Sequence, residues 1–131
     1  MDKSVTKIPC DLKTFFRYWL MFLQPLHNLP PKEMEVLSYI LKKRYELSKF
    51  IVDDSKIDTF LFSKDIREEI IEENGITKNT LQVSLTNLRK AGILLEGDKI
   101  HKRFIPPLTK DSTRFDLMLL FEITDNAESK S

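Results

Sequence analysis

The chain has 131 residues, of which 41% are hydrophobic, so it suffices for one domain with a buried core but not for a second independent domain. Its 21 lysines and arginines almost balance its 20 aspartates and glutamates, and the resulting charge of +1 excludes a general attraction to nucleic-acid phosphates. The single cysteine, Cys10, excludes an internal disulfide bond and a cysteine-rich zinc site. We therefore expect a single domain over residues 1–131, in which any binding to nucleic acid depends on local charge.

Neither a membrane-spanning segment nor a secretory leader is predicted. The most apolar stretch, residues 15–23, contains Arg17 and is stopped by Pro25, well short of the roughly 20 residues that a helical span requires. The N-terminus lacks the basic start and apolar middle of a leader, and Asp2 and Asp11 interrupt any such pattern. We expect a protein that stays in the cytoplasm where it is made, or joins an assembly built there, with no membrane partner.

The first predicted helix covers about residues 11–24, with Asp11 as its N-cap. Apolar side chains recur at helical spacing along one side, and Phe16 and Leu20 make a second side apolar. A helix that is apolar on more than one side is normally covered on more than one side. A neighbouring subunit can supply the second cover, and the candidate interface residues here are Phe15, Phe16, Trp19 and Phe22.

The two prolines at residues 30–31 predict a turn into a second helix, with Glu33 near the positive end of its dipole. The basic run at residues 42–44 comes late in this helix, where cations interact favourably with the negative end of the helix dipole. It is either a solvated face that complements the dipole or a contact for an acidic partner or a phosphate. The side chains expected to form the buried stripe are Val36, Leu37, Ile40, Leu41 and Leu47.

The connection over residues 50–62 is rich in aspartate and serine, and its pattern assigns no conformation to it. Its apolar side chains are nevertheless expected to pack against the core. These are Ile57, Phe60, Leu61 and Phe62.

Two helices joined by a short glycine turn are predicted over about residues 63–91. Ser63 caps the first helix, Gly75 is well placed to end it in a left-handed conformation, and Thr77 caps the second. Gly92 closes the second helix. So tight a connection between two helices indicates a helix-turn-helix. The residues of the second helix that repeat at intervals of four and three, and so face inward, are Leu81, Leu85 and Leu88.

A hairpin is predicted over about residues 93–105, with its reversal at Gly97, and two prolines at residues 106–107 end it. A hairpin directly after a helix-turn-helix is typical of the wing of a winged-helix domain. Together with the two preceding helices, this hairpin completes the predicted winged helix.

Residues 114–124 alternate apolar side chains with Asp116 and Glu122, a period of two that predicts a C-terminal strand. Met118 and Leu120 interrupt the polar side and are further candidates for a subunit interface. The expected fold class is therefore α+β, a winged helix-turn-helix with an extra N-terminal helix and a C-terminal strand.

The sequence contains little that favours catalysis. His27 and His101 lie in a predicted turn and in the wing, and neither shares a motif with a nucleophile or has a metal-ligand spacing. Three glycines in the whole chain provide no phosphate-cradling loop. We expect no enzyme activity, no cofactor, no metal site and no small-molecule substrate. A cluster of carboxylates has the spacing of an exposed helix face, which is solvated unless it receives a basic neighbour. It consists of Glu68, Glu69, Glu72 and Glu73.

Helical geometry turns a polar stripe outward on the second helix of the predicted helix-turn-helix. Asparagine, glutamine and arginine side chains can read base edges, and lysines can hold phosphates. The same stripe is also compatible with an ordinary solvated face. The candidate residues for contact with a partner or DNA are Lys78, Asn79, Gln82, Thr86, Arg89 and Lys90, with Lys99, Lys102 and Arg103 on the wing.

Local charge differs between the two parts of the helix-turn-helix region. Residues 77–105 contain six basic and two acidic residues, a local charge of +4, whereas residues 63–76 contain two basic and five acidic residues, a charge of −3. A DNA reader usually keeps its whole docking face positive, because phosphate neutralisation supplies much of the affinity. A positively charged region beside a negatively charged one suits head-to-tail protein contacts at least as well. In such a contact the basic wing of one copy lies against the acidic helix of the next.

Six segments carry a resemblance to known proteins: FFRYWLMFLQPLH at residues 15–27, EMEV at 33–36, LKKRYELSK at 41–49, QV at 82–83, LRK at 88–90 and KRFIP at 102–106. They span most of the chain, from about Leu12 to Pro106, and resemble a group of small proteins encoded by crAss-like tailed phages of gut Bacteroidetes. The resemblance implies a virion structural gene whose winged helix is a building block of the particle, for instance in a ring between portal and tail. It includes no catalytic signature and transfers no site residues.

Two functional hypotheses follow. In the first, the chain is a non-enzymatic structural protein of a phage virion, assembled in the host cytoplasm. It binds other virion proteins and copies of itself, as a ring or connector component of the portal-tail region. In the second, it is a DNA-binding transcriptional regulator that inserts the helix at residues 77–91 into a major groove, with the wing on phosphates. Near-neutral charge, the unusually apolar first helix and the alternating local charge favour the first hypothesis.

Overall fold

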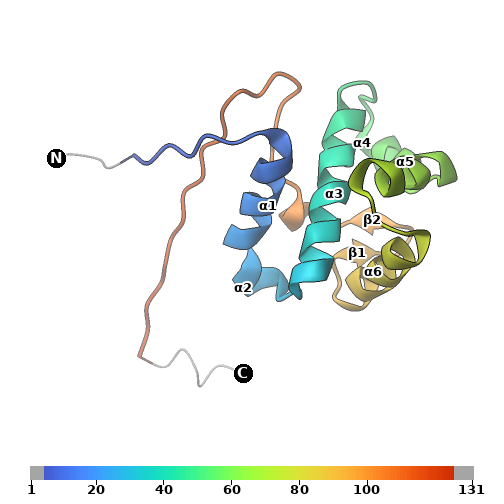
Figure 1. Cartoon of the computed structure of the whole chain (residues 1–131). Coiled ribbons are helices and arrows are strands. Elements are labelled where there is room, and N and C mark those ends of the chain that lie inside the picture. The colour runs from blue at the N-terminus through green and yellow to red at the C-terminus, as the bar shows by residue number, and fades with distance from the viewer. Residues whose placement is uncertain (1–4, 126–131) are drawn as a thin grey trace.

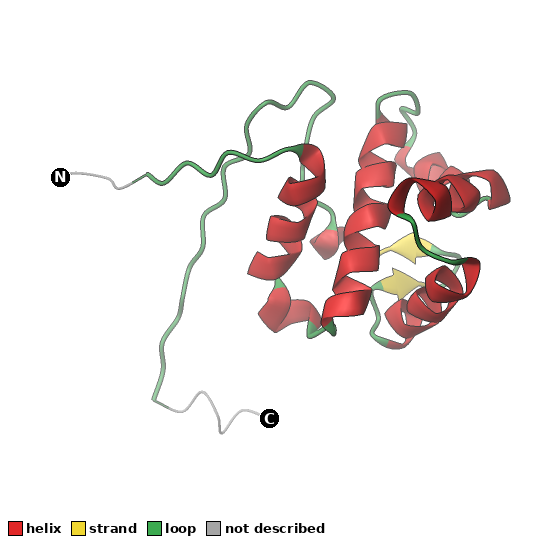
Figure 2. Ribbon diagram, viewed as in Figure 1, coloured by secondary structure: helices red, strands yellow, loops and turns green. Residues whose placement is uncertain are grey.

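The computed structural model describes residues 5–125 and shows a mostly helical fold with one small antiparallel sheet (Figure 1). This content agrees with the predicted α+β class. Loops and extended segments make up the rest of the described chain (Figure 2). Its helices are α1 (Leu12–Phe22), α2 (Gln24–His27), α3 (Pro31–Ser48), α4 (Asp54–Leu61), α5 (Lys64–Asn74) and α6 (Lys78–Lys90). They are followed by strands β1 (Leu94–Leu95) and β2 (Lys99–Ile100) and by a 3₁₀ turn, η1 (Lys102–Phe104).

Capping side chains confirm most of the predicted helix boundaries. The Asp11 carboxylate accepts a hydrogen bond from the Thr14 N–H at 2.8 Å and begins α1. Ser63 and Thr77 each accept a hydrogen bond from the N–H group three residues later, and so begin α5 and α6. α1 ends earlier than predicted, at Phe22, because the short separate helix α2 follows it.

α3 is the central helix and contacts α1, α4, α5 and α6 (Figure 1). The predicted stripe between Val36 and Leu41 is buried, and Tyr45 is buried beside it. α1 packs against α3 through Phe16 and Leu20. The core is therefore built around α3, and α6 packs onto it through the leucines predicted to face inward, Leu81, Leu85 and Leu88.

The connection over residues 50–62 contains α4, which Asp53 caps with its side chain. Ile57 and Leu61 lie one turn apart on this helix and are buried, as predicted. The expectation that Phe60 packs against the core is wrong. Its side chain is exposed, because it lies off the side of α4 that carries Ile57 and Leu61.

The predicted hairpin is present but shorter than residues 93–105. Gly97 has a φ of +81°, a left-handed value that glycine adopts without strain, and this allows the tight reversal. After Ile100 the chain turns into η1, because the His101 ring accepts a hydrogen bond from the Arg103 N–H at 3.1 Å. Two pairs of residues face each other in the register of the hairpin, Leu94 with Ile100 and Leu95 with Lys99.

The prediction of a strand over residues 114–124 is wrong. This segment forms no strand, and no backbone hydrogen bond joins it to the other described residues. It passes α1 and then leaves the domain, while the hairpin lies beyond α3 (Figure 1). Alternating side chains favour an extended backbone, but a strand also needs a neighbour with which to pair, and within the described chain none lies beside this segment.

Candidate binding surface on α6 and the hairpin

α6 presents a polar stripe to solvent, as predicted, because its leucines occupy the opposite side. The apolar side chain of Val83 is also exposed on this helix. The orientation of the candidate residues is thus confirmed, while their role in binding stays a prediction. All nine of them are exposed: Lys78, Asn79, Gln82, Thr86, Arg89, Lys90, Lys99, Lys102 and Arg103.

Polar contacts at both ends position α6. Gly75 has a φ of +63° and reverses the chain between α5 and α6, where the Ile76 N–H donates to the Ile71 carbonyl at 3.2 Å. On α3, the carboxylate of Glu33 accepts a hydrogen bond from the side-chain amide of Asn87 at 2.8 Å. Glu33 is buried, so water competes little for this bond. The candidate surface therefore lies on a helix held by both apolar and polar contacts.

An ion pair links α6 to the hairpin. Arg89 Nη2 lies 3.0 Å from Asp98 Oδ1, at the reversal of the hairpin. Both side chains are about half exposed, so the pair adds little stability. It does place a negative charge within the predicted basic surface and partly neutralises Arg89. A partner that binds Arg89 must either break its ion pair with Asp98 or contact Asp98 as well.

Asp58 anchors the other side of the hairpin and was not among the residues predicted to matter. It is 7% exposed on α4. Its carboxylate accepts hydrogen bonds from Arg44 Nε at 2.7 Å and from the Ile100 N–H at 3.1 Å. The side chain thus joins α3, α4 and β2. No local signal identifies it, since an aspartate in an irregular Asp-rich connection resembles a solvated residue.

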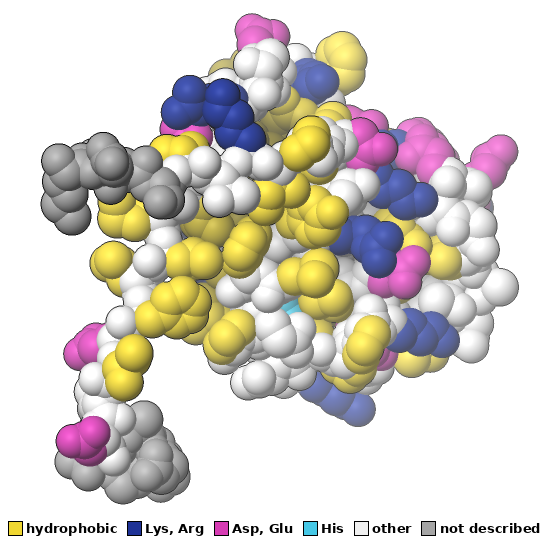
Figure 3. Space-filling view, turned by 60° about the vertical axis from the view of Figure 1, so that its left-hand side comes forward, with side chains coloured by type: hydrophobic (Ala, Val, Ile, Leu, Met, Phe, Trp, Pro, Cys, Tyr) yellow, Lys and Arg dark blue, Asp and Glu magenta, His cyan; other side chains and the backbone are white. Residues whose placement is uncertain are grey.

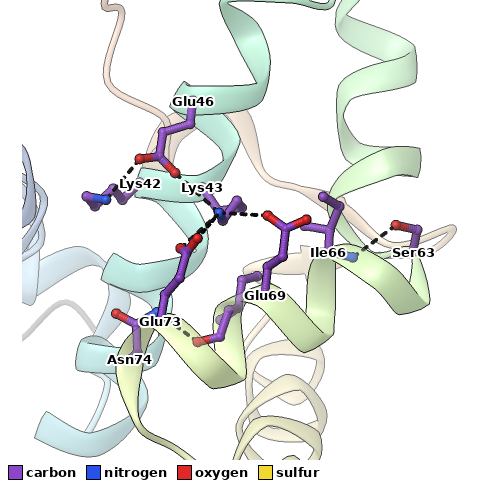
Figure 4. Close-up of polar contacts among 9 residues, drawn as sticks. Lys42, Lys43, Glu46, Ser63, Ile66, Glu69, Glu73 and Asn74 are labelled. Atoms are coloured by element: carbon purple, nitrogen blue, oxygen red, sulfur yellow. Dashed lines mark hydrogen bonds and ion pairs between the residues drawn. The ribbon is translucent and has the colours of Figure 1, made fainter.

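The basic run at residues 42–44 forms internal ion pairs, so its interpretation as a solvated face is wrong. Lys43 is buried, and its ammonium group lies 3.2 Å from the Glu69 carboxylate and 2.9 Å from the Glu73 carboxylate of α5 (Figure 4). Glu46 completes the cluster at 3.4 Å. Burial alone would lower the pKa of Lys43, but the three carboxylates outweigh it and raise the pKa above its ordinary value.

This cluster reduces the acidic surface that α5 offers to a partner. Two of the carboxylates counted in the local charge of −3 are engaged by Lys43 within the chain. The predicted contact between the basic wing of one copy and the acidic helix of the next therefore loses part of its basis. The exposed acidic side chains of α5 outside this cluster are Asp65, Glu68 and Glu72.

The predicted subunit interface on α1 is largely wrong. Phe16 and Trp19 are 1% and 7% exposed, because α3 covers one side of α1 and Trp19 Nε1 donates to the Phe104 carbonyl at 2.8 Å. Phe15 is half-buried against Phe115, with ring centroids 5.2 Å apart. The second cover of α1 thus comes from its own chain. Among the predicted α1 positions, only Phe22 is exposed.

The two remaining interface candidates, Met118 and Leu120, lie on the segment over residues 113–125, which we name the C-terminal arm. They are 81% and 86% exposed. Phe121 and Ile123 are uncovered to a similar degree, whereas Leu117 and Leu119 are partly covered. Figure 3 shows hydrophobic side chains along the segment that projects from the domain. The arm residues with exposures between 41% and 91% are Leu117, Met118, Leu119, Leu120, Phe121 and Ile123.

Both histidines bind backbone groups. The buried ring of His27 lies with Nε2 2.7 Å from the Leu20 carbonyl, and Nδ1 accepts a hydrogen bond from the Leu29 N–H at 2.9 Å. This pairing assigns the neutral tautomer with the proton on Nε2. Within residues 5–125, no three histidine, cysteine, aspartate or glutamate side chains are grouped so that they could hold a metal ion. None of the described helices has the length and apolarity needed to cross a membrane.

Comparisons with known protein families, with curated proteins and with solved structures find no match to this chain. The geometry described above and the segment resemblance are therefore the observations that bear on function. In that geometry, two surfaces are available to a partner: the polar surface of α6 and the hairpin, and the apolar C-terminal arm.

Proposed function

We propose that this chain is a non-enzymatic assembly protein of a phage virion, a ring or connector component of the portal-tail region. In this proposal it is assembled in the host cytoplasm and binds neighbouring subunits, including copies of itself, through a winged-helix domain. The succession of α5, a glycine turn, α6 and a hairpin supports the winged-helix interpretation. The resemblance of segments between residues 12 and 106 to proteins of crAss-like phages supports the place in the virion.

The uncovered C-terminal arm is the observation that carries a binding role. Six large apolar side chains on one continuous segment remain in contact with water. Burying one such side chain is worth about 1.5–3 kcal/mol, so a partner that covers all six gains on the order of 10 kcal/mol before the cost of association. Exposed apolar surface of this kind marks an interaction site on a soluble protein.

The surface of α6 and the hairpin also favours a protein partner. Its basic side chains are accompanied by the carboxylate of Asp98 and by the exposed apolar side chains of Val83 and Leu95. Mixed charge with apolar side chains is typical of protein contacts, whereas a phosphate backbone favours uniform positive charge.

Mass spectrometry of purified phage particles tests the proposal. We expect peptides of this chain to be present in a fixed ratio to the other structural proteins, in particles that have been washed at high salt. Particles that lack the polypeptide would overturn the virion assignment. Peptides found only in the lysate of infected cells would have the same consequence.

A DNA-binding regulator is the second candidate, and the exposure of the stripe that includes Lys78, Gln82 and Arg89 favours it. A gel shift at low salt on phage and host DNA tests it. If α6 contacts phosphates, Lys78→Ala weakens binding on all sequences and reduces the salt dependence by about one unit of slope, while Lys32→Ala on the exposed start of α3 has no effect. Absence of any shift at low salt eliminates this candidate.

A further inference from the structure

An open groove of about 760 Å³ lies between the hairpin and the start of α4. Leu95, Ile105 and Pro107 give it an apolar lining, and Lys99 and Lys102 add basic side chains. Asp54 is exposed at the start of α4, while the carboxylate of Asp58 is engaged by Arg44 and by β2. The groove therefore combines apolar surface with a small excess of positive charge.

The edge of β2 in this groove is closed to an added strand. The Ile100 N–H, the group that would pair with such a strand, is already bonded to Asp58 at 3.1 Å. A bonded edge does not recruit another backbone. An occupant of this groove is consequently held by its side chains.

Among the described residues, the hydrogen bonds and aromatic contacts that attach the C-terminal arm to the domain lie at or just before its start. Just before the arm, the Tyr45 hydroxyl donates to the carbonyls of Thr109 and Lys110 at 2.9 and 3.2 Å. Within the arm, Phe115 packs against Trp19 with ring centroids 5.6 Å apart. Beyond Asp116 every described side chain of the arm is exposed. At about 3.3 Å per residue, the apolar part over residues 117–123 extends for about 23 Å.

The arm and the groove are complementary in chemistry. Arg114 and Asp116 form an ion pair with each other at 2.8 Å, so the outer arm carries its net charge on Glu122 and Asp125. These carboxylates match the lysines of the groove, and the apolar side chains between them match its lining. Within one chain the two do not meet, since the arm leaves beside α1 while β2 and α4 lie beyond it, around α3 (Figure 1).

We propose that the C-terminal arm of one copy binds in the groove between β2 and α4 of a second copy. This inference rests on the proposed assembly function and specifies how copies of the chain contact one another. Apolar side chains led by Met118 and Leu120 supply the attraction, and Glu122 against the groove lysines sets the direction. The two contacting surfaces differ, so the association is head to tail. Repetition of such a contact produces a closed ring or an open filament.

Sedimentation velocity on the full chain, over a range of micromolar concentrations, tests this contact. We expect the average mass of the unmodified chain to rise with concentration. An arm variant with Met118→Asp and Leu120→Asp stays monomeric, and so does a groove variant with Lys99→Glu and Lys102→Glu. The matched control with Met21→Asp and Leu26→Asp, exposed apolar positions on α1 and α2, associates like the unmodified chain. Circular dichroism verifies that every variant is folded.

Mixing the two defective variants gives the sharper test. The arm variant keeps an intact groove and the groove variant keeps an intact arm, so an equimolar mixture forms one-to-one dimers that cannot grow further. A mixture that remains monomeric would overturn the proposal. So would a groove variant that still associates by itself, because that result indicates contact between two arms.

The outcome separates this inference from the proposed function. A chain that is monomeric at all concentrations, yet present in purified particles, overturns the arm contact and leaves the virion assignment standing. A chain that associates through arm and groove, yet is absent from particles, supports the contact and overturns the virion assignment.

Discussion

Asp58 joins three elements through one carboxylate. Oδ1 accepts a hydrogen bond from Arg44 on α3, and Oδ2 accepts one from the Ile100 N–H on β2. The Arg44 side chain is 12% exposed. Loss of Asp58 would therefore leave both a nearly buried cation and a buried N–H group without a partner, and each is costly in a medium that excludes water.

We expect Asp58→Ala to lower the free energy of unfolding by about 3–5 kcal/mol, the cost of removing one partner of a buried ion pair. Chemical denaturation measures this change, and hydrogen exchange at residues 94–100 should become faster as the hairpin loosens. Asp54→Ala, at an exposed position of the same helix, is the control and should change stability by less than about 0.5 kcal/mol. Equal effects of the two substitutions would contradict the anchoring role.

Tyr39 is buried on α3, and its hydroxyl donates a hydrogen bond to the Glu35 carboxylate. Burial raises the pKa of Tyr39 to about 12, and the hydrogen bond to Glu35 and its negative charge act in the same direction. The folded state thus holds this proton more tightly than the unfolded chain. The resulting stabilisation is fully present below the ordinary pKa of 10.0 and is lost as the pH rises through about 12.

An absorbance titration of tyrosinate should show one ionisation near pH 12 that disappears in Tyr39→Phe. Glu35→Gln retains a hydrogen-bond acceptor but removes the charge, so the midpoint should move to lower pH. A midpoint unaffected by either substitution would show that Tyr39 is not the group observed.

At the scale of elements, a cluster of charged side chains joins α3 to α5. The buried Lys43 is surrounded by carboxylates of Glu46, Glu69 and Glu73 (Figure 4). Burial alone would raise the pKa of Glu46, but the hydrogen bond and charge of Lys42 and the charge of Lys43 lower it overall. The stabilisation from Glu46 is therefore present above its ordinary pKa of 4.5 and lost as the pH falls through its lower value in the folded state.

The two sides of this cluster should respond differently to substitution. We expect replacement of both Glu69 and Glu73 by alanine to cost about 1–3 kcal/mol, because it leaves the buried ammonium group of Lys43 short of partners. Lys43→Met should cost less, since it removes the buried charge itself and leaves carboxylates that reach water. Denaturant unfolding at pH 7 measures both variants, with the Glu68→Ala and Glu72→Ala pair on the same helix as control. A larger cost for Lys43→Met than for the double glutamate variant would contradict this account.

At the scale of the whole molecule, residues 5–125 form a domain with a buried core and an arm that contributes little to it. All the buried core residues lie between Phe16 and Phe104, and Phe115 is the one arm residue among those packed against them. The arm beyond Asp116 therefore has no evident role in folding. Under the proposed self-contact, a second molecule covers its apolar side chains.

We expect a chain that ends at Asp116 to unfold at nearly the same temperature as the full chain, because it retains Phe115 and the entire core. The same truncation should abolish self-association, as measured by sedimentation velocity. Calorimetry compares the two chains under conditions in which both are monomeric. A fall of more than a few degrees in the melting temperature would show that the arm stabilises its own domain, against the arrangement described here.

Local signals allowed the helices and the candidate surface to be predicted. Asp11, Ser63, Thr77 and Gly75 act on backbone groups within a few residues of themselves, so their sequence positions determine where helices begin and end. The spacing of the leucines on α6 likewise determines which side of that helix is polar. Short-range bonds and helical periodicity are properties of a continuous stretch of chain, and they are readable before it folds.

The sequence by itself thus determined the helices, their caps, the turn between α5 and α6 and the orientation of the polar stripe. Only the tertiary structure decided what covers each apolar or charged side chain. Trp19 is buried and donates a hydrogen bond to Phe104, 85 residues away, and Lys43 pairs with carboxylates on α5. Residues 114–124 have no strand beside them within the described chain. The reason is physical: periodicity states which side chains share a face, whereas the neighbour that covers the face comes from a distant segment or another molecule.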